Sequence, residues 1–175
     1  MKSLLFVIDM QNDFIDGALG TSEAQAIVPH VIKRIQEFEG DVIFTRDTHK
    51  TNYLETQEGK NLPVPHCIDG TDGWQLHPEL NKYAEEHDCP IIDKFTFGSK
   101  DLPVFIKIHY PQPIESIELI GLCTDICVIS NAMVLKTFFP EIPIRVTASC
   151  CAGVTPESHK NALEAMKMCQ ITILE

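Results

Sequence analysis

The sequence predicts an α/β fold in three layers, with a mostly parallel sheet of roughly six strands covered by helices on both faces. Two observations predict it. Short apolar runs alternate with longer amphipathic stretches along the chain, as in the strand–helix–strand units that build parallel sheets. The apolar runs are nearly continuous, which is typical of strands buried on both faces. The length of 175 residues fits one domain, so we expect a single domain over residues 1–175.

The expected elements follow one another in strand–helix order. The expected strands cover residues 3–8, 41–45, 90–93, 116–122, 142–147 and 170–174. The expected helices cover residues 24–38, 77–87, 101–109, 126–138 and 156–168. In the first helix the apolar residues recur at helical spacing, and Gly40 closes it.

The longest irregular segment covers residues 48–76. A loop of that length in a compact domain is usually functional. In open α/β sheets the ligand binds at the carboxyl ends of the strands. We therefore expect the functional residues in this segment and directly after the strands.

The charge balance argues against two classes of partner. The chain has 25 acidic and 14 basic residues, a net charge of −11, whereas nucleic acids and anionic membrane surfaces attract positive proteins. Seven cysteines show no framework spacing, and the apolar run before Asp9 is short. We therefore expect reduced thiols, no nucleic-acid or membrane partner, and a cytoplasmic protein.

Three residues that could carry chemistry lie where expected strands end. Asp9 and Lys94 each follow an apolar run, and Cys127 lies near the start of a helix that we expect to begin near Asp125. Taken singly, they fit a turn aspartate, a solvent-facing lysine and a core cysteine. Together, a base, a cation and a thiol at one sheet edge would form a nucleophilic site. The helix dipole would lower the pKa of the thiol and favour the thiolate.

A second cluster has the residue types of a metal site. Asp47 and His49 are two residues apart after the second expected strand, and His66 lies later in the irregular segment. Two imidazoles and a carboxylate suit a catalytic Zn²⁺, Mn²⁺ or Fe²⁺. Glu55 or Glu58 could add a ligand. A hydrogen-bonded network of loop histidines is the alternative.

The order of these motifs resembles that of the isochorismatase-like cysteine hydrolase superfamily, and within it the nicotinamidase-like amidases. The resemblance runs through nearly the whole chain. The motifs that carry it are LLFVIDMQNDF, TRDTH, PHCIDGTDGW, the segment around Lys94, GLCTDICV and TASCCAG.

This resemblance implies a catalytic triad of Asp9, Lys94 and Cys127. The implied activity is hydrolysis of a small amide through a thioester acyl-enzyme, with nicotinamide giving nicotinate and ammonia. It also implies a cis peptide between Leu122 and Cys123 and an oxyanion hole formed by the backbone amides of Cys123 and Cys127. Cys127 itself sets the chain apart from isochorismatases that lack the catalytic cysteine.

The resemblance also implies one divalent metal ion, with zinc expected and manganese or iron as alternatives. The implied ligands are Asp47, His49 and His66, and Glu58 is a candidate for an additional ligand. We further expect a homo-oligomer.

The chain departs from the nicotinamidases in its substrate pocket. They often have an aromatic residue three positions before the second metal-binding histidine, and here that residue is Pro63. Phe14, Trp74 and Phe97 are the candidates for an aromatic side chain that replaces the missing one in the substrate pocket.

Three alternatives remain open at this point. The first is an amidase for a ureido or carbamoyl compound, and the second is a non-catalytic binding protein on the same fold. The third is a redox thiol protein, for which Cys123 is the only nearby resolving cysteine. The intact set of Asp9, Lys94 and Cys127 favours an amidase.

Overall fold

The computed structural model describes all 175 residues and contains six strands in one sheet. The strands are β1 (Lys2–Ile8), β2 (Asp41–Asp47), β3 (Ile91–Lys94), β4 (Ile114–Leu122), β5 (Ile144–Ala152) and β6 (Thr172–Leu174). Their order is β3-β2-β1-β4-β5-β6, and every neighbouring pair is parallel. The predicted fold class is confirmed, and the sheet is wholly rather than mostly parallel.

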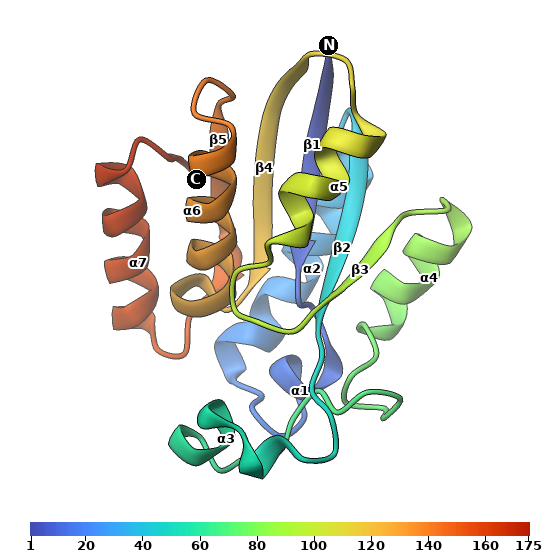
Figure 1. The fold of residues 1–175 in the computed structure, drawn as a ribbon, viewed down its shortest axis with the longest axis vertical. Coiled ribbons are helices and arrows are strands. Elements are labelled where there is room, and N and C mark those ends of the chain that lie inside the picture. Colours follow the sequence, from blue (N-terminus) through green and yellow to red (C-terminus); the bar gives the residue numbers. More distant parts are fainter.

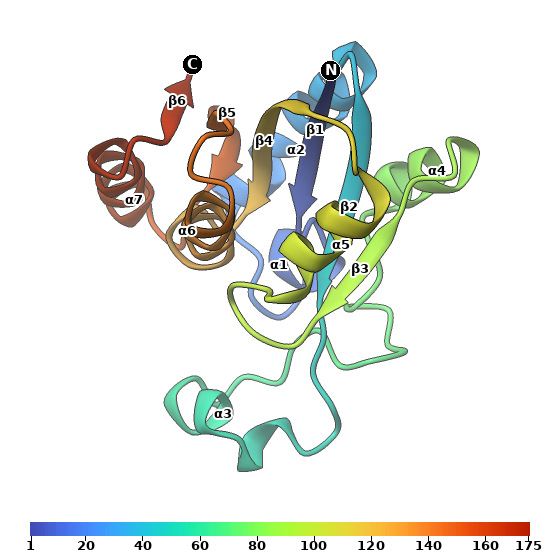
Figure 2. The same cartoon turned by 45° about the horizontal axis from the view of Figure 1, so that its top comes forward.

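Helices cover both faces of this sheet (Figures 1 and 2). The α-helices are α1 (Asn12–Ile15), α2 (Ser22–Glu37), α3 (Gln57–Asn61), α4 (Pro78–Glu86), α5 (Asp101–His109), α6 (Ile129–Phe138) and α7 (Pro156–Met168). Two further turns are a 3₁₀ helix at Tyr53–Glu55 and a π-helical turn at Thr124–Val128. None of the helices combines the length and hydropathy that crossing a membrane requires.

The strand β1 shows how the sheet separates two cores. Leu5 and Val7 point to one side, into a cluster with apolar residues of α1, α2 and α4. Leu4, Phe6 and Ile8 point to the other side, into a cluster with residues of α5, α6 and α7. Since successive strand residues face opposite sides, a continuous apolar run is what a strand between two helical layers requires.

Several elements differ from the predictions at their ends. The helix α2 begins at Ser22, because Thr21 caps it by accepting a hydrogen bond from the Ala24 amide at 3.0 Å. The strand β5 continues to Ala152, five residues beyond its predicted end at residue 147. The segment 48–76, expected to be irregular, contains the 3₁₀ helix and α3. These short turns have too few residues for a hydrophobic period to reveal them.

The strand order reverses between β1 and β4, and ligands of open α/β sheets bind at the carboxyl ends of strands beside such a reversal. A close approach of the two backbones marks this point. Gly121 in β4 has φ +113°, and a Cβ atom there would lie 2.2 Å from the Ile8 carbonyl oxygen. Only glycine fits at this position, and it lets the two strands approach closely. Asp9, after β1, and the Cys123–Cys127 turn, after β4, therefore lie side by side. The α3 segment projects from the same end of the sheet (Figures 1 and 2).

Candidate active site

Asp9 directly follows β1 and has left-handed backbone geometry, with φ +47°. Its side chain is fully buried, with Thr45 donating to Oδ1 at 2.6 Å and Lys94 Nζ lying 2.6 Å from Oδ2. These partners make the burial of a carboxylate tolerable. Burial raises the pKa of Asp9, and the positive charge of Lys94 opposes that rise. A carboxylate with a raised pKa is a stronger base than an exposed one.

Lys94, the last residue of β3, lies at the centre of the site. Its Nζ is 2.6 Å from Asp9 Oδ2 and 3.1 Å from Asp47 Oδ1, and it donates to Cys127 Sγ at 3.3 Å. Burial alone would lower the pKa of Lys94, but the negative charges of Asp9 and Asp47 outweigh it and raise the pKa well above its usual value. The ammonium therefore stays protonated between two carboxylates and a thiol.

Cys127 lies in the π-helical turn that precedes α6, not in the first turn of an α-helix as predicted. Its side chain is buried beside Asp9 and Lys94. Burial, followed by the charge of Asp9, raises the pKa of the thiol well above its usual value. The predicted lowering of this pKa is therefore wrong, because desolvation and a nearby carboxylate exceed the favourable effects of Lys94 and the turn. The resting group is a thiol, and it needs a base.

The peptide bond between Leu122 and Cys123 is cis, as the resemblance implied. The backbone amide of Cys123 follows β4 and donates no hydrogen bond within the protein. An N–H group without an acceptor, next to the turn that carries Cys127, is available to a bound oxyanion.

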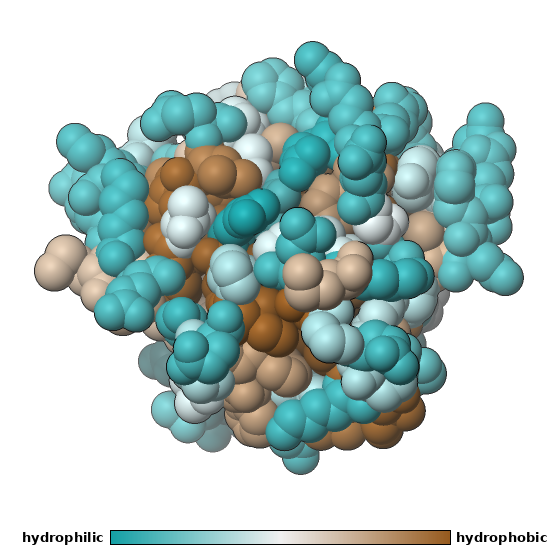
Figure 3. Space-filling view, turned by 90° about the horizontal axis from the view of Figure 1, so that it is seen from above, coloured by the Kyte–Doolittle hydropathy of each residue, from teal (hydrophilic) through white to brown (hydrophobic).

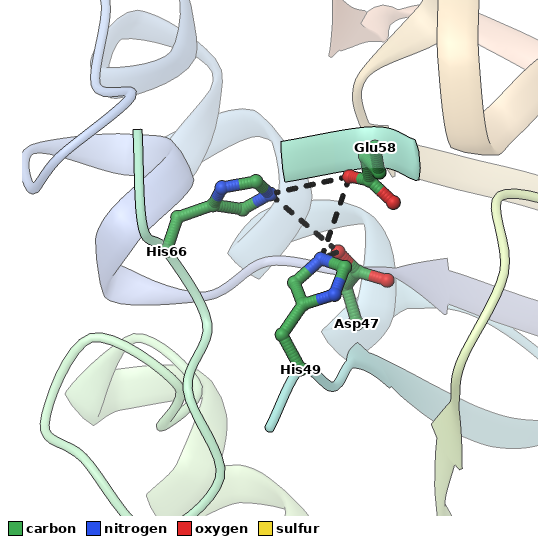
Figure 4. A group of neighbouring side chains, drawn as sticks. All are labelled: Asp47, His49, Glu58 and His66. Carbon is green, nitrogen blue, oxygen red and sulfur yellow. Dashed lines mark ion pairs between the residues drawn. The ribbon is translucent and has the colours of Figure 1, made fainter. Parts of the chain in front are cut away.

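The metal-type residues converge beside the triad, and Figure 4 shows all four side chains pointing toward one another. His49 Nε2 lies 2.9 Å from Asp47 Oδ2 and 3.5 Å from Glu58 Oε1. His66 Nε2 lies 3.8 Å from Asp47 Oδ2 and 3.7 Å from Glu58 Oε1. Two ligands of a tetrahedral ion with bonds of about 2.0–2.1 Å are about 3.3–3.4 Å apart. The four histidine–carboxylate separations lie close to that value, and all four ligand atoms lie within 4.8 Å of one another.

Two further contacts fit a metal ion. His66 Nδ1 lies 2.8 Å from the Val64 carbonyl oxygen, a contact that orients the ring with Nε2 facing the group. Such a bond to the far nitrogen is the usual way to orient a metal-binding histidine. His49 Nε2 is buried, and although it lies 2.9 Å from Asp47 Oδ2 it forms no hydrogen bond of suitable geometry. An ion would satisfy that atom, so the residues present fit a divalent metal.

A cavity of about 550 Å³ opens beside the triad and the metal-type residues. Its lining includes Cys127, Cys123, Asp47, Glu58 and His66 at the polar end, together with Phe14, Leu19, Gln57, Asn61, Leu62, Phe95, Thr96, Phe97 and Ile126. Phe14 and Phe97, two of the residues expected in the substrate pocket, line this cavity.

Pro63 and Trp74, the other two residues expected in the substrate pocket, do not line this cavity. Trp74 donates from its indole to Thr48 Oγ1 at 2.9 Å, and the Arg46 guanidinium packs 3.6 Å from its ring centroid. These contacts hold the Trp74 ring between Thr48 and Arg46. The residue before Pro63, Leu62, lines the cavity in its place.

Reasoning from the sequence missed several supporting residues. Gln11 accepts from the Asp47 amide at 2.7 Å and donates to the Asp47 carbonyl oxygen at 2.9 Å, which fixes Asp47 from both sides. Asn131 donates to the carbonyl oxygens of Cys127 and Phe97, at 2.8 and 3.0 Å. A buried amide in an otherwise apolar helix was the available signal for Asn131.

The opposite end of the sheet has a different character. Figure 3 views this end, where hydrophilic side chains surround patches of hydrophobic atoms. A second cavity of about 500 Å³ lies there, with Lys2, Asp41 and Tyr110 in its lining. It contains no group of converging metal-type residues. The chemistry of the chain is thus concentrated at the carboxyl ends of the strands.

Comparison with known proteins agrees with this geometry. The isochorismatase domain family matches residues 3–175. The chain belongs to the isochorismatase family. It is 32% identical to the isochorismatase family protein PncA of Bacillus subtilis over 93% of each chain.

Solved structures of this family have the same fold. A pyrazinamidase/nicotinamidase of Streptococcus mutans superimposes with a TM-score of 0.86 at 27% identity, covering 98% of this chain and 99% of the other. A pyrazinamidase of Pyrococcus horikoshii in complex with zinc superimposes with a TM-score of 0.82 at 26% identity, covering 100% and 99%. The chain is therefore a nicotinamidase-like hydrolase of the isochorismatase family, and the group Asp47, His49, Glu58 and His66 supports a divalent metal.

Proposed function

We propose that the chain hydrolyses a small aromatic carboxamide, with nicotinamide as the reference substrate, to the acid and ammonia. The observation that carries this proposal is the buried contact of Lys94 with both Asp9 and Cys127 at the base of a cavity. A base, a cation and a thiol in this arrangement support acyl transfer through a thioester.

The first half-reaction forms the acyl-enzyme. Asp9 removes the proton of the Cys127 thiol as Sγ bonds to the amide carbon. The backbone amides of Cys123 and Cys127 stabilise the resulting oxyanion, and Lys94 remains protonated and balances the charge. Asp9 then gives its proton to the amide nitrogen, the C–N bond breaks, and ammonia leaves.

The second half-reaction releases the acid. Asp9 removes a proton from water as the water oxygen bonds to the thioester carbon. The C–S bond breaks, the acid leaves, and the Asp9 proton returns to the Cys127 sulfur. Asp47, His49, Glu58 and His66 would hold a divalent ion, for which we propose zinc. When bound, the ion supplies an electrophilic anchor for a substrate ring nitrogen or a bound water.

The cavity favours a neutral substrate over an anionic one. No lysine or arginine lines it, whereas Asp47 and Glu58 do. A ureido acid would bring a carboxylate that no lysine or arginine of the cavity wall could pair with. The predicted cytoplasmic location and homo-oligomeric state remain part of this proposal.

Ammonia release from a panel of amides tests the proposal. The panel contains nicotinamide, pyrazinamide, a ureidoacrylate and biuret, each with the metal-loaded protein. We expect turnover of the two aromatic amides and none by Cys127→Ala, with near-normal rates for Cys150→Ala. If only the ureidoacrylate or biuret were hydrolysed, the proposed aromatic carboxamide substrate would be wrong and the enzyme would act on a ureido compound. Substantial activity of Cys127→Ala would exclude the thioester route.

A further inference from the structure

The cavity has two chemically different ends. Its base holds Cys127, Asp47 and His66, which are buried. Its mouth is open: Phe95 is 59% exposed and Leu62 is 39% exposed, and the exposed polar residues Gln57, Asn61 and Thr96 lie among the lining side chains. Large apolar side chains exposed around a concave site mark a surface that binds an apolar group.

Nicotinamide is too small to use both ends. It has nine non-hydrogen atoms, and at about 30 Å³ each, the volume that a water molecule takes up in the liquid, it needs at most about 270 Å³. The cavity measures about 550 Å³. With the amide carbon at Cys127 Sγ, roughly half of the cavity stays free on the side of the mouth.

The two walls of the mouth are held by separate contacts. Tyr53 is buried and donates from its hydroxyl to the Leu62 carbonyl oxygen at 2.9 Å, which fixes the chain after α3. On the other side, Lys94 donates to the Thr96 carbonyl oxygen at 3.3 Å, next to Phe95. Hydrogen bonds within the protein therefore fix the backbone on both sides of the mouth.

We propose that the preferred substrates are aryl or heteroaryl carboxamides with an uncharged apolar substituent on the ring, which lies between Leu62 and Phe95. This inference rests on the proposed amidase function. The apolar walls stabilise the substituent by removing it from water. A charged substituent is disfavoured, because no lysine or arginine lines the cavity and the apolar side chains of Leu62 and Phe95 offer a charge no partner.

The test compares kcat/KM of the metal-loaded protein for nicotinamide and for 5-phenyl- and 6-phenylnicotinamide. We expect at least one phenyl derivative to exceed nicotinamide by at least about tenfold, since a single methylene in a hydrophobic pocket changes kcat/KM by about 10-fold to 200-fold. Leu62→Ser and Phe95→Ser should each lower this preference by at least about fivefold. Both residues are partly exposed, so neither substitution should prevent folding.

Leu54→Ser is the matched control. Leu54 is exposed on the neighbouring 3₁₀ helix but does not line the cavity, so the preference should not change. Turnover of nicotinamide with poor turnover of both phenyl derivatives would overturn the inference and leave the amidase function standing. No ammonia from any of the three amides would overturn both. If the preference for the phenyl derivatives were the same in Leu62→Ser, Phe95→Ser and the wild type, the substituent would not bind between Leu62 and Phe95.

Discussion

Lys94 connects the candidate triad to the candidate metal site. Its ammonium contacts Asp9 and Cys127 on one side and Asp47 Oδ1 on the other, while Asp47 Oδ2 faces His49. One carboxylate thus contacts both the catalytic cation and the residues that fit a metal. A change at either group alters the field at the other, since buried charges are only weakly screened.

Asp9→Asn tests the base. The amide keeps the shape of the carboxylate but cannot accept the thiol proton, and the burial that raises the pKa of Cys127 is unchanged. We expect kcat to fall by about 10²–10⁴-fold, the usual contribution of a general base. Stopped assays of ammonia release give this value. Asp16→Asn, an exposed change in the same region of the chain, serves as the control, and near-normal turnover by Asp9→Asn would assign the base elsewhere.

Glu58→Gln tests the fourth metal ligand. Glu58 Oε1 lies 3.5 and 3.7 Å from the two histidine nitrogens, so loss of its charge should weaken zinc binding at least about tenfold. Competition with a coloured chelator measures this affinity without any substrate. Glu55→Gln removes an exposed carboxylate three residues earlier and should leave the affinity unchanged. Equal zinc affinities for both variants and the wild type would remove Glu58 from the site.

At the scale of elements, α7 holds the turn that carries Cys127. Thr124 is buried, and its Oγ1 lies 2.7 Å from His159 Nδ1 in α7. The amide of Val154 donates to both Asp125 carboxylate oxygens, at 3.1 and 3.3 Å. Burial lowers the pKa of His159, so its ring is neutral and can accept the Thr124 hydroxyl hydrogen. His159 is thus a positioning residue for the turn.

His159→Ala should lower kcat about tenfold with a smaller change in KM, because small displacements of reacting groups are costly and the cavity walls stay in place. His159→Asn, which can still accept from Thr124, should recover part of the rate. Steady-state kinetics on nicotinamide give both values. Thr124→Val should add little to His159→Ala, since the two residues share one contact. Additive losses, or an unchanged kcat in His159→Ala, would show that this contact has no catalytic consequence.

The sequence predicted the long elements because each has a hydrophobic pattern of its own. The helices α5 and α7 begin and end where the pattern predicted. It could not predict the π-helical turn, since nothing in TDICV distinguishes it from an α-helical turn. The α3 segment was likewise missed, because its path depends on Tyr53 binding the Leu62 carbonyl and not on periodicity.

Only part of the candidate site could be predicted from the sequence. Asp9, Lys94 and Cys127 could be grouped from sequence, since parallel strands bring their carboxyl ends to one edge. Pro63 was assigned to the pocket by counting from His66, but the chain turns Leu62 inward instead. The pKa of Cys127 was predicted with the wrong sign, because its burial and the approach of Asp9 are tertiary features.

At the scale of the whole molecule, a buried ion pair fastens α2 to the middle of the sheet. Arg34 donates to both carboxylate oxygens of Glu118 in β4, at 2.8 and 2.6 Å. Thr147 in β5 donates to Glu118 Oε1 at 2.7 Å. Only 3% of the Glu118 side chain is exposed, against 29% of the Arg34 side chain, so Arg34 and Thr147 supply the hydrogen bonds that water would otherwise give this carboxylate.

Arg34→Met should lower the free energy of unfolding by about 3–5 kcal/mol, because it leaves a buried carboxylate unpaired. Urea denaturation measures this change. Lys33→Met, which removes the exposed pair with Glu37, should cost less than about 1 kcal/mol. The double change Arg34→Met and Glu118→Met should recover much of the loss. If Arg34→Met and Lys33→Met lowered the free energy of unfolding equally, the pair of Arg34 with Glu118 would not stabilise the fold more than an exposed ion pair does.

Acid-quenched mass spectrometry during nicotinamide turnover tests the central claim that Cys127 forms the acyl-enzyme. We expect a fraction of the protein to carry one nicotinoyl group, located at Cys127 after digestion and released by hydroxylamine as a thioester is. Cys127→Ala should carry none. Full turnover with no adduct on any residue under conditions that trap a thioester, or an adduct on another residue, would contradict the account.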